Sequence, residues 1–243
     1  MATKTKVKRG VSLSLHPAVI TSIPGYEEAR GYVAHSATAL DSAYQSIEAV
    51  VKARAKLSRD ESRTPKAQVL MAAELAEQYM GKLQKTFELS WDKLHSGIDH
   101  IDKQLSEPME QQAGAGTISG EIRSHAKSLE HEERRKLISD ALHRGDIKTT
   151  SAILGAPAYL SGLQAEEQKH YTRTYHEATN PELTRRLQVM TKAKEKLEQS
   201  KRIIRAEMDK AVGASKSEID KLRTGSSEAE DELILKIFTQ VGD

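Results

Sequence analysis

Two pairs of side chains in the sequence have the spacing of metal ligands on a helix. Glu167 and His170 are three residues apart, which places a carboxylate and an imidazole on one helix face, as in the di-iron centres of helical bundles. Such a centre needs a second pair and two further carboxylates. The nearest repeat of the pattern, Asp92 and His95, falls on the polar face of a different predicted helix. We therefore expect these side chains to be solvated and predict no metal site.

The other catalytic patterns are incomplete. His176 and Glu177 begin the zinc-protease motif, but Asn180 stands where the second histidine belongs and fits a helix cap better. The glycines between Gln112 and Gly120 neither follow a predicted strand nor end in the Lys-Ser or Lys-Thr pair of a phosphate-binding loop. The chain has no nucleophile elbow and no cysteine. The sequence therefore predicts a protein that is not an enzyme and that binds no cofactor and no small-molecule substrate.

A basic stretch between residues 183 and 205 is the strongest candidate for a binding surface. Eight basic residues stand there against two acidic ones, so a helix would present positive charge able to follow a nucleic-acid backbone. The residues predicted to contact nucleic acid are Arg185, Arg186, Lys194, Lys201, Arg202 and Arg205. Because no aromatic residues are interleaved for base stacking, the stretch is also explained as a solvated face or as a partner for an acidic helix such as Glu228 to Glu232.

The composition favours helices with one buried face and a broad solvated one. Of the 243 residues, 37% are hydrophobic, 4% aromatic and 30% charged, and the formal charge is +2. This balance does not by itself indicate a polyanionic partner. No stretch approaches the roughly 20 consecutive apolar residues of a membrane-spanning helix, so we expect no membrane partner. The lack of cysteine fits a reducing compartment.

The first two long helices are predicted to form an antiparallel hairpin over residues 24–106. Apolar residues recur every seven positions from Tyr26 to Ile47, as in a coiled coil. A charged run then interrupts the pattern, and Thr64 and Pro65 have the types expected at a helix cap and in a first helical turn. A short polar connection between two long helices favours a hairpin.

The region after the hairpin changes character. Pro108 and the glycines that follow it predict a loop over residues 107–120. Residues 121–180 are expected to form several short helices, because Gly145 and Asp146 have the types of a helix end and of a helix cap.

A third long helix is predicted over residues 181–225. Apolar residues recur in it every seven positions from Leu183 to Ala211. The second line of this apolar face is interrupted by Lys194 and Lys201, so we expect the helix to present only a narrow apolar stripe.

Both ends of the chain carry apolar residues that we expect to need a partner. Residues 1–23 hold four basic residues and no acidic one, and are predicted to form an extended basic arm in which apolar residues alternate with serine as in a short strand. The alternative is a terminus without fixed structure. Residues 226–243 begin acidic and continue as an amphipathic docking segment. The predicted protein interface comprises Val11, Leu13, Leu15, Ile234, Ile237, Phe238 and Val241.

The stretch SDALHRGDIKTTSAILGAPAYLSGL, from Ser139 to Leu163, contains a short helix ending in HRGD, a second ending in ILGAP, and then YLSGL. In these elements it resembles uncharacterised helical proteins encoded near the head-assembly genes of tailed phages. The resemblance implies a virion or virion-assembly context, with the protein in the cytoplasm of a host cell and also in a virion. It transfers no site residues.

The sequence thus predicts an all-α protein, an elongated helical bundle whose function is that of a non-enzymatic structural or assembly component of a phage particle. Its expected partners are further copies of the chain or other structural subunits. The alternative is a helical nucleic-acid-binding module that uses residues 183–205 and the basic arm.

Overall fold

All regular secondary structure in the described part of the chain is helical, which confirms the predicted all-α class. The computed structural model describes residues 10–109 and 116–240, with the backbone alone for 229–240. The α-helices in chain order are α1 (Ala18–Thr21), α2 (Tyr26–Leu57), α3 (Pro65–Leu105), α4 (Gly116–Ser128), α5 (His131–Arg144), α6 (Ile147–Leu154), α7 (Ala165–Thr179), α8 (Pro181–Val212) and α9 (Lys216–Gln240), and two 3-10 turns, η1 and η2, span Leu13–Leu15 and Ala158–Leu160.

The helices form two units. Unit 1 contains Met1–His95 and Val189–Asp243, and unit 2 contains Ser96–Gln188. The long helices α3 and α8 each contribute to both units. Domain boundaries therefore fall within helices, where the sequence carries no glycine- or proline-rich linker that would reveal them.

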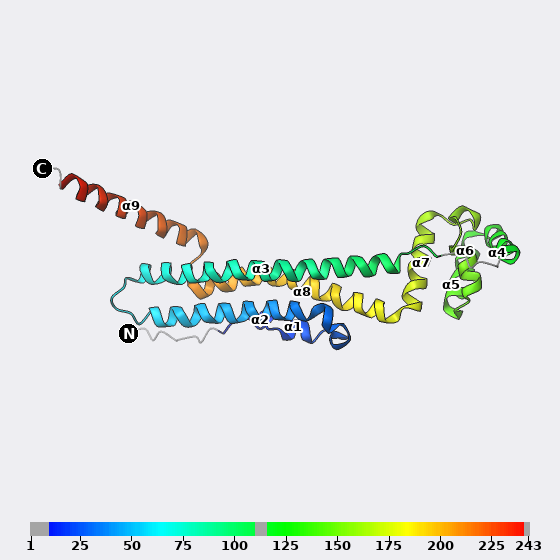
Figure 1. Ribbon diagram of the computed structural model, residues 1–243, viewed down its shortest axis with the longest axis horizontal. Coiled ribbons are helices and arrows are strands. Elements are labelled where there is room, and N and C mark those ends of the chain that lie inside the picture. Colours follow the sequence, from blue (N-terminus) through cyan, green and yellow to red (C-terminus); the bar gives the residue numbers. More distant parts are fainter. Residues whose placement is uncertain (1–9, 110–115, 241–243) are drawn as a thin grey trace. The chain divides into compact units, whose positions relative to one another are not determined.

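Unit 1 is built on three long helices, α2, α3 and α8, which lie side by side (Figure 1). The predicted seven-residue recurrence in α2 forms the buried face, where Val33, Leu40 and Ile47 are at most 1% exposed. The corresponding face of α8 includes Met190 and Leu197, which are also buried. Each helix thus stabilises the unit by removing one apolar stripe from water.

The turn between α2 and α3 follows the chemistry that the sequence predicts. The side-chain oxygen of Thr64 accepts a hydrogen bond from the backbone N–H of Ala67 at 3.2 Å, which satisfies one of the donors left free at the start of α3. Further along the hairpin, the hydroxyl of Ser90 donates to the carbonyl oxygen of His35 at 3.1 Å and ties α3 to α2.

The predicted short strand in the N-terminal arm is wrong, because the structure has the turn η1 at these residues. The hydroxyl of Ser12 accepts a hydrogen bond from the backbone N–H of Ser14 and starts this turn. Helix α1 follows and packs on α2, and both Leu15 and Ile20 are fully buried. The predicted arm is therefore folded against its own unit from Gly10 onward.

The third long helix is shorter than predicted, since α8 ends at Val212 and α9 begins at Lys216. Gly213 adopts a φ of +78°, a left-handed conformation that ends α-helices and that glycine tolerates best. Ser215 then caps α9 in a capping box, because its hydroxyl oxygen accepts from the backbone N–H of Glu218 at 3.4 Å and its own backbone N–H donates to the Glu218 carboxylate at 2.7 Å. The predicted helix end at Gly225 lies within α9.

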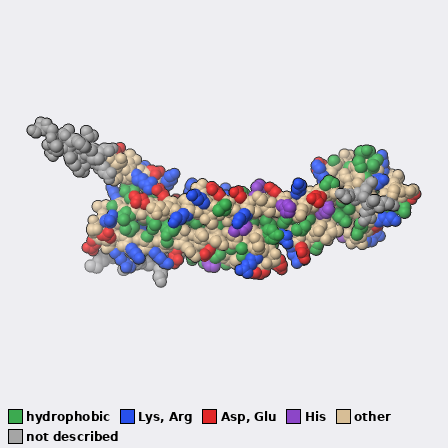
Figure 2. Space-filling model, in the orientation of Figure 1, with side chains coloured by type: hydrophobic (Ala, Val, Ile, Leu, Met, Phe, Trp, Pro, Cys, Tyr) green, Lys and Arg blue, Asp and Glu red, His purple; other side chains and the backbone are tan. Residues whose placement is uncertain are grey.

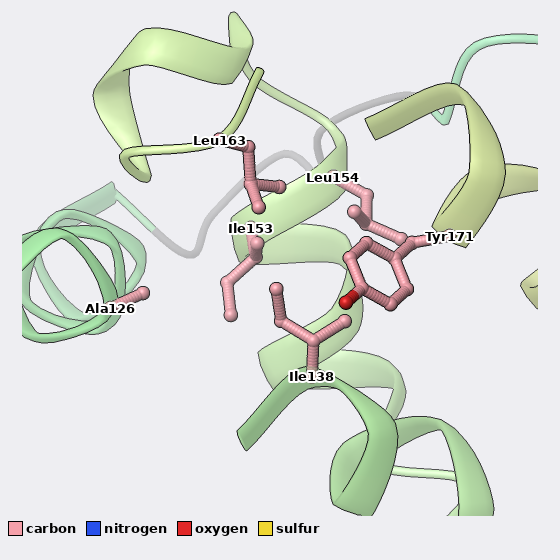
Figure 3. Packing of buried hydrophobic residues seen from close by; sticks show 6 residues of the cluster. All are labelled: Ala126, Ile138, Ile153, Leu154, Leu163 and Tyr171. Carbon is pink, nitrogen blue, oxygen red and sulfur yellow. The ribbon is translucent and has the colours of Figure 1, made fainter. Parts of the chain in front are cut away.

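Unit 2 contains a small apolar core formed by its short helices (Figure 3). The side chains that make it come from α4, α5, α6, α7 and the segment before α7, and are Ala126, Ile138, Ile153, Leu154, Leu163 and Tyr171. Helix α4 starts at Gly116, so the predicted loop over residues 107–120 is wrong at its C-terminal end. Burial of Ser119 and packing of Ile122 on the core offset the low helix propensity of Gly116 and Gly120.

Side chains that bind backbone carbonyls hold unit 2 together. The guanidinium of Arg134 donates to the carbonyl oxygens of Ala126 at 2.8 Å, Gly162 at 2.6 Å and Leu129 at 2.6 Å. The amide of Gln168 donates to two carbonyl oxygens at the end of α6, at 2.7 and 2.6 Å. These contacts satisfy carbonyls in the last turns of α4 and α6 and in the connections between helices.

Candidate functional site

A groove between α3 and α8 in unit 1 is the strongest candidate for a binding surface. It has a volume of about 870 Å³. Residues 80–88 of α3 form one wall and residues 201–209 of α8 form the other. The groove exists because two helices of a three-helix bundle meet along one line and leave a furrow on the outer side.

The floor of the groove is apolar. It is formed by Leu83, Phe87 and Ile204, whose exposed fractions are 3%, 5% and 4%. Met80 is half-buried beside them. These side chains belong to the apolar stripes of their helices, so the groove lies directly over the core of unit 1.

The rim of the groove carries more basic than acidic groups. Lys201, Arg202 and Arg205 are exposed on the α8 side, while Glu88 and Asp209 contribute the acidic groups. Neither Arg202 nor Arg205 forms a hydrogen bond or an ion pair with another described residue. Both guanidinium groups are thus available to an acidic partner.

Trp91 of α3 holds two of the basic residues that were predicted to contact nucleic acid. The ammonium nitrogens of Lys194 and Lys201 lie 4.8 Å and 4.6 Å from the centroid of its ring. Cations at this distance over an indole face are attracted by its quadrupole. The two lysines that interrupt the predicted apolar stripe of α8 therefore place their charges over the ring of Trp91.

The predicted nucleic-acid contacts are divided between the two units. Arg185 and Arg186 belong to unit 2, whereas the other four residues belong to unit 1. Arg185 is exposed and Arg186 is half-buried with an interaction partner. On the face seen in Figure 2, Lys and Arg side chains of the bundle are interspersed with Asp and Glu. This face therefore does not present a uniform basic stripe.

The predicted protein interface is divided between buried, exposed and undescribed residues. Leu15 is buried within unit 1, while Leu13 is 77% exposed. Val11 is half-buried and lines a groove with Ile47 and Ala211. The side chains of Ile234, Ile237 and Phe238, as well as Val241, lie outside the described residues.

Glu167, whose spacing from His170 resembles that of metal ligands on a helix, has a structural role. One of its carboxylate oxygens accepts a hydrogen bond from the backbone N–H of Gln164 at 2.9 Å, and the other lies 2.8 Å from Nε2 of His131. The backbone hydrogen bond and then His131 hold the pKa of the Glu167 carboxyl below its ordinary value. Its neighbour His170 packs against the ring of Tyr171. Within the described residues, no group of three or more side chains could hold a metal ion.

Comparisons with protein-family models, with curated proteins and with solved structures found no match for this chain. Among the described helices, none combines the length and apolar character needed to cross a membrane.

Proposed function

We propose that the protein is a non-enzymatic structural or assembly component that self-associates or packs on partner subunits through helix–helix contacts. The groove between α3 and α8 carries this proposal. Its floor is the outer side of the core formed by Leu83, Phe87 and Ile204, and its rim is charged. A further helix in the groove would complete a four-helix arrangement and exclude water from this floor.

Unit 2 offers a second set of exposed apolar side chains that supports packing on a partner. Ile118, Ile147 and Tyr159 are 49%, 49% and 68% exposed, and Leu160 is 38% exposed. Tyrosine is enriched at protein interfaces because it combines a large apolar ring with a hydrogen-bonding hydroxyl. Scattered apolar residues are normal on protein surfaces, so this observation adds to the groove and does not replace it.

The phage context of the proposal comes from the resemblance of residues 139–163. In the structure these residues run from α5 through α6 and η2 to Leu163, and they supply Ile153, Leu154 and Leu163 to the core of unit 2. We propose on this basis that the protein belongs to a virion or acts in its assembly.

Removal of residues 228–243 tests the assembly function. The full chain is expected to have a molar mass that is a multiple of 26.9 kDa, and the truncated chain is expected to contain fewer subunits while losing only the helix of the removed segment. Circular dichroism verifies the helix content and light scattering gives the mass. Equal subunit numbers for the two proteins would count against the C-terminal segment as an assembly element.

Nucleic-acid binding remains the alternative, and it is favoured by the guanidinium groups of Arg202 and Arg205, which pair with no other residue in the described part of the chain. It predicts that the Arg202→Glu and Arg205→Glu double variant loses affinity for duplex DNA, and that the wild-type affinity falls steeply with salt. Fluorescence anisotropy with a labelled duplex measures both. Unchanged affinity in the double variant would exclude this use of α8.

A further inference from the structure

We propose that the groove between α3 and α8 receives the acidic, apolar C-terminal part of α9, residues 228–240, from a second copy of this chain. The inference rests on the proposed self-association and names the two surfaces that carry it. One is the groove over Leu83, Phe87 and Ile204. The other is the end of a helix that runs from Lys216 to Gln240.

The charges of the two surfaces are complementary. The α8 side of the groove carries Lys201, Arg202 and Arg205. The incoming segment begins with four acidic residues within five positions, Glu228, Glu230, Asp231 and Glu232. Arginine forms bidentate hydrogen bonds with carboxylates, and such pairs fix the register of an association as well as adding attraction. An acidic helix therefore suits this rim better than a neutral one.

The apolar residues of the segment suit the floor of the groove. Ile234, Ile237 and Phe238 are spaced by three and four positions, which places them on one face of a helix. The groove extends over residues 80–88 of α3, or about 12 Å at 1.5 Å per residue. Residues 230–238 have the same length, so one short stretch can lie along the groove with its acidic residues in the first turn and its apolar residues in the turns that follow.

The position of residues 228–240 along the chain indicates that they bind the groove of a second copy and not the groove of their own chain. If α9 folded back along α8 as a helical hairpin, closed by the short connection 213–215, Arg223 would lie level with about residue 205 of α8. Residues 228–240 would then lie beyond Lys201, past the groove. Thr224, Gly225 and two serines would then cover much of the apolar floor.

The observed contact of α9 with α3 also differs from such a hairpin. Trp91 lies between Lys194 and Lys201, so the antiparallel pairing of α3 with α8 places Glu77 level with the end of α8, near residue 212. The guanidinium of Arg223 pairs with Glu77 through two hydrogen bonds of 2.8 Å. The first turns of α9 are thus fixed at the end of the bundle, which leaves the groove open to another chain.

Cross-linking between engineered cysteines tests the inference cleanly, because the chain has none of its own. Full-length Gln84→Cys protein, with the cysteine on the groove wall, is mixed with nitrogen-15-labelled Ala229→Cys protein and treated with a short bismaleimide. We expect a cross-linked peptide that joins labelled and unlabelled chains. A protein with Thr38→Cys, exposed on α2, replaces the Gln84→Cys protein as the control and should give no such product.

Charge reversal at the rim gives the second measurement. Arg202→Glu with Arg205→Glu should weaken self-association about tenfold or more, and Glu230→Lys with Glu232→Lys in the same chain should restore it. The control is Lys192→Glu with Lys196→Glu, which changes the same charge at exposed positions of α8 outside the groove.

The outcomes separate this inference from the proposed function. An oligomer that is unaffected by charge reversal and gives no cross-linked peptide between chains would overturn the binding of residues 228–240 in the groove. It would leave the proposed self-association intact. Cross-linking confined to single chains in a protein carrying both cysteines would also overturn it. A chain that stays monomeric at every concentration would remove the proposed self-association itself.

Discussion

Replacing Arg134 by methionine removes the guanidinium from unit 2 while keeping most of its apolar stem. Three backbone carbonyls, those of Ala126, Leu129 and Gly162, then lose charged donors at 2.8, 2.6 and 2.6 Å. A buried acceptor without its donor costs about 1–3 kcal/mol. Because these groups are only partly buried, we expect a loss of about 3–5 kcal/mol, a large part of the roughly 5–15 kcal/mol by which a domain is usually stable.

Hydrogen exchange measured by mass spectrometry detects this loss locally. Arg134 joins the end of α4 to Gly162, so amides of α4 and of residues 160–163 should exchange much faster in the variant. The neighbouring Arg135 provides the control, since it is exposed and pairs with Glu132 at 3.2 Å. Arg135→Met should change exchange little, because exposed ion pairs contribute at most about 1 kcal/mol. Equal effects of the two substitutions would refute the carbonyl-binding role of Arg134.

Three further substitutions test other parts of the structure. Gly213→Ala should lower the free energy of unfolding by about 1–2 kcal/mol, measured by urea denaturation. The reasons are the positive φ at this position and the close contact that the added Cβ would make with the Arg54 side chain. Asp146→Ala should cost about 1 kcal/mol at pH 7 through loss of the α6 cap, and no cost would contradict the capping role. Since the cap hydrogen bonds hold the pKa of the Asp146 carboxyl below its ordinary value, this stability is present above about pH 4 and is lost as the pH falls through the lowered pKa. Lys201→Met should cost about 0.5–1 kcal/mol and shift the fluorescence of Trp91, the single tryptophan, whereas an unchanged spectrum would argue against the cation–π contact.

The long helices could be predicted from the sequence because their signals are local. The seven-residue recurrence from Tyr26 to Ile47 and the cap at Thr64 both depend on residues close in sequence, and the structure confirms them. Gly145 and Asp146 likewise end α5 and begin α6 as predicted. The break at Gly213 also had a local signal in the Ser215 and Glu218 capping box, which the seven-residue recurrence from Leu183 to Ala211 outweighed.

The candidate groove and the core of unit 2 depend on contacts between distant parts of the chain. Trp91 meets Lys194 and Lys201 only once α3 and α8 are packed, so the pattern of α8 alone made these lysines look like interruptions. Arg134 gives no sequence signal either, because its acceptors are backbone atoms of other segments. The start of α4 at Gly116 reflects packing that overrides local propensity.

The molar mass of the full-length protein in solution tests self-association most directly. Light scattering over about 1–100 μM protein, without and with duplex DNA, should give a mass that rises with concentration to a defined multiple of 26.9 kDa and does not depend on DNA. Salt from about 50 to 500 mM should weaken the association, because charged pairs at the groove rim are screened. A mass of 26.9 kDa at every concentration, with DNA binding that salt reverses, would contradict the assembly function.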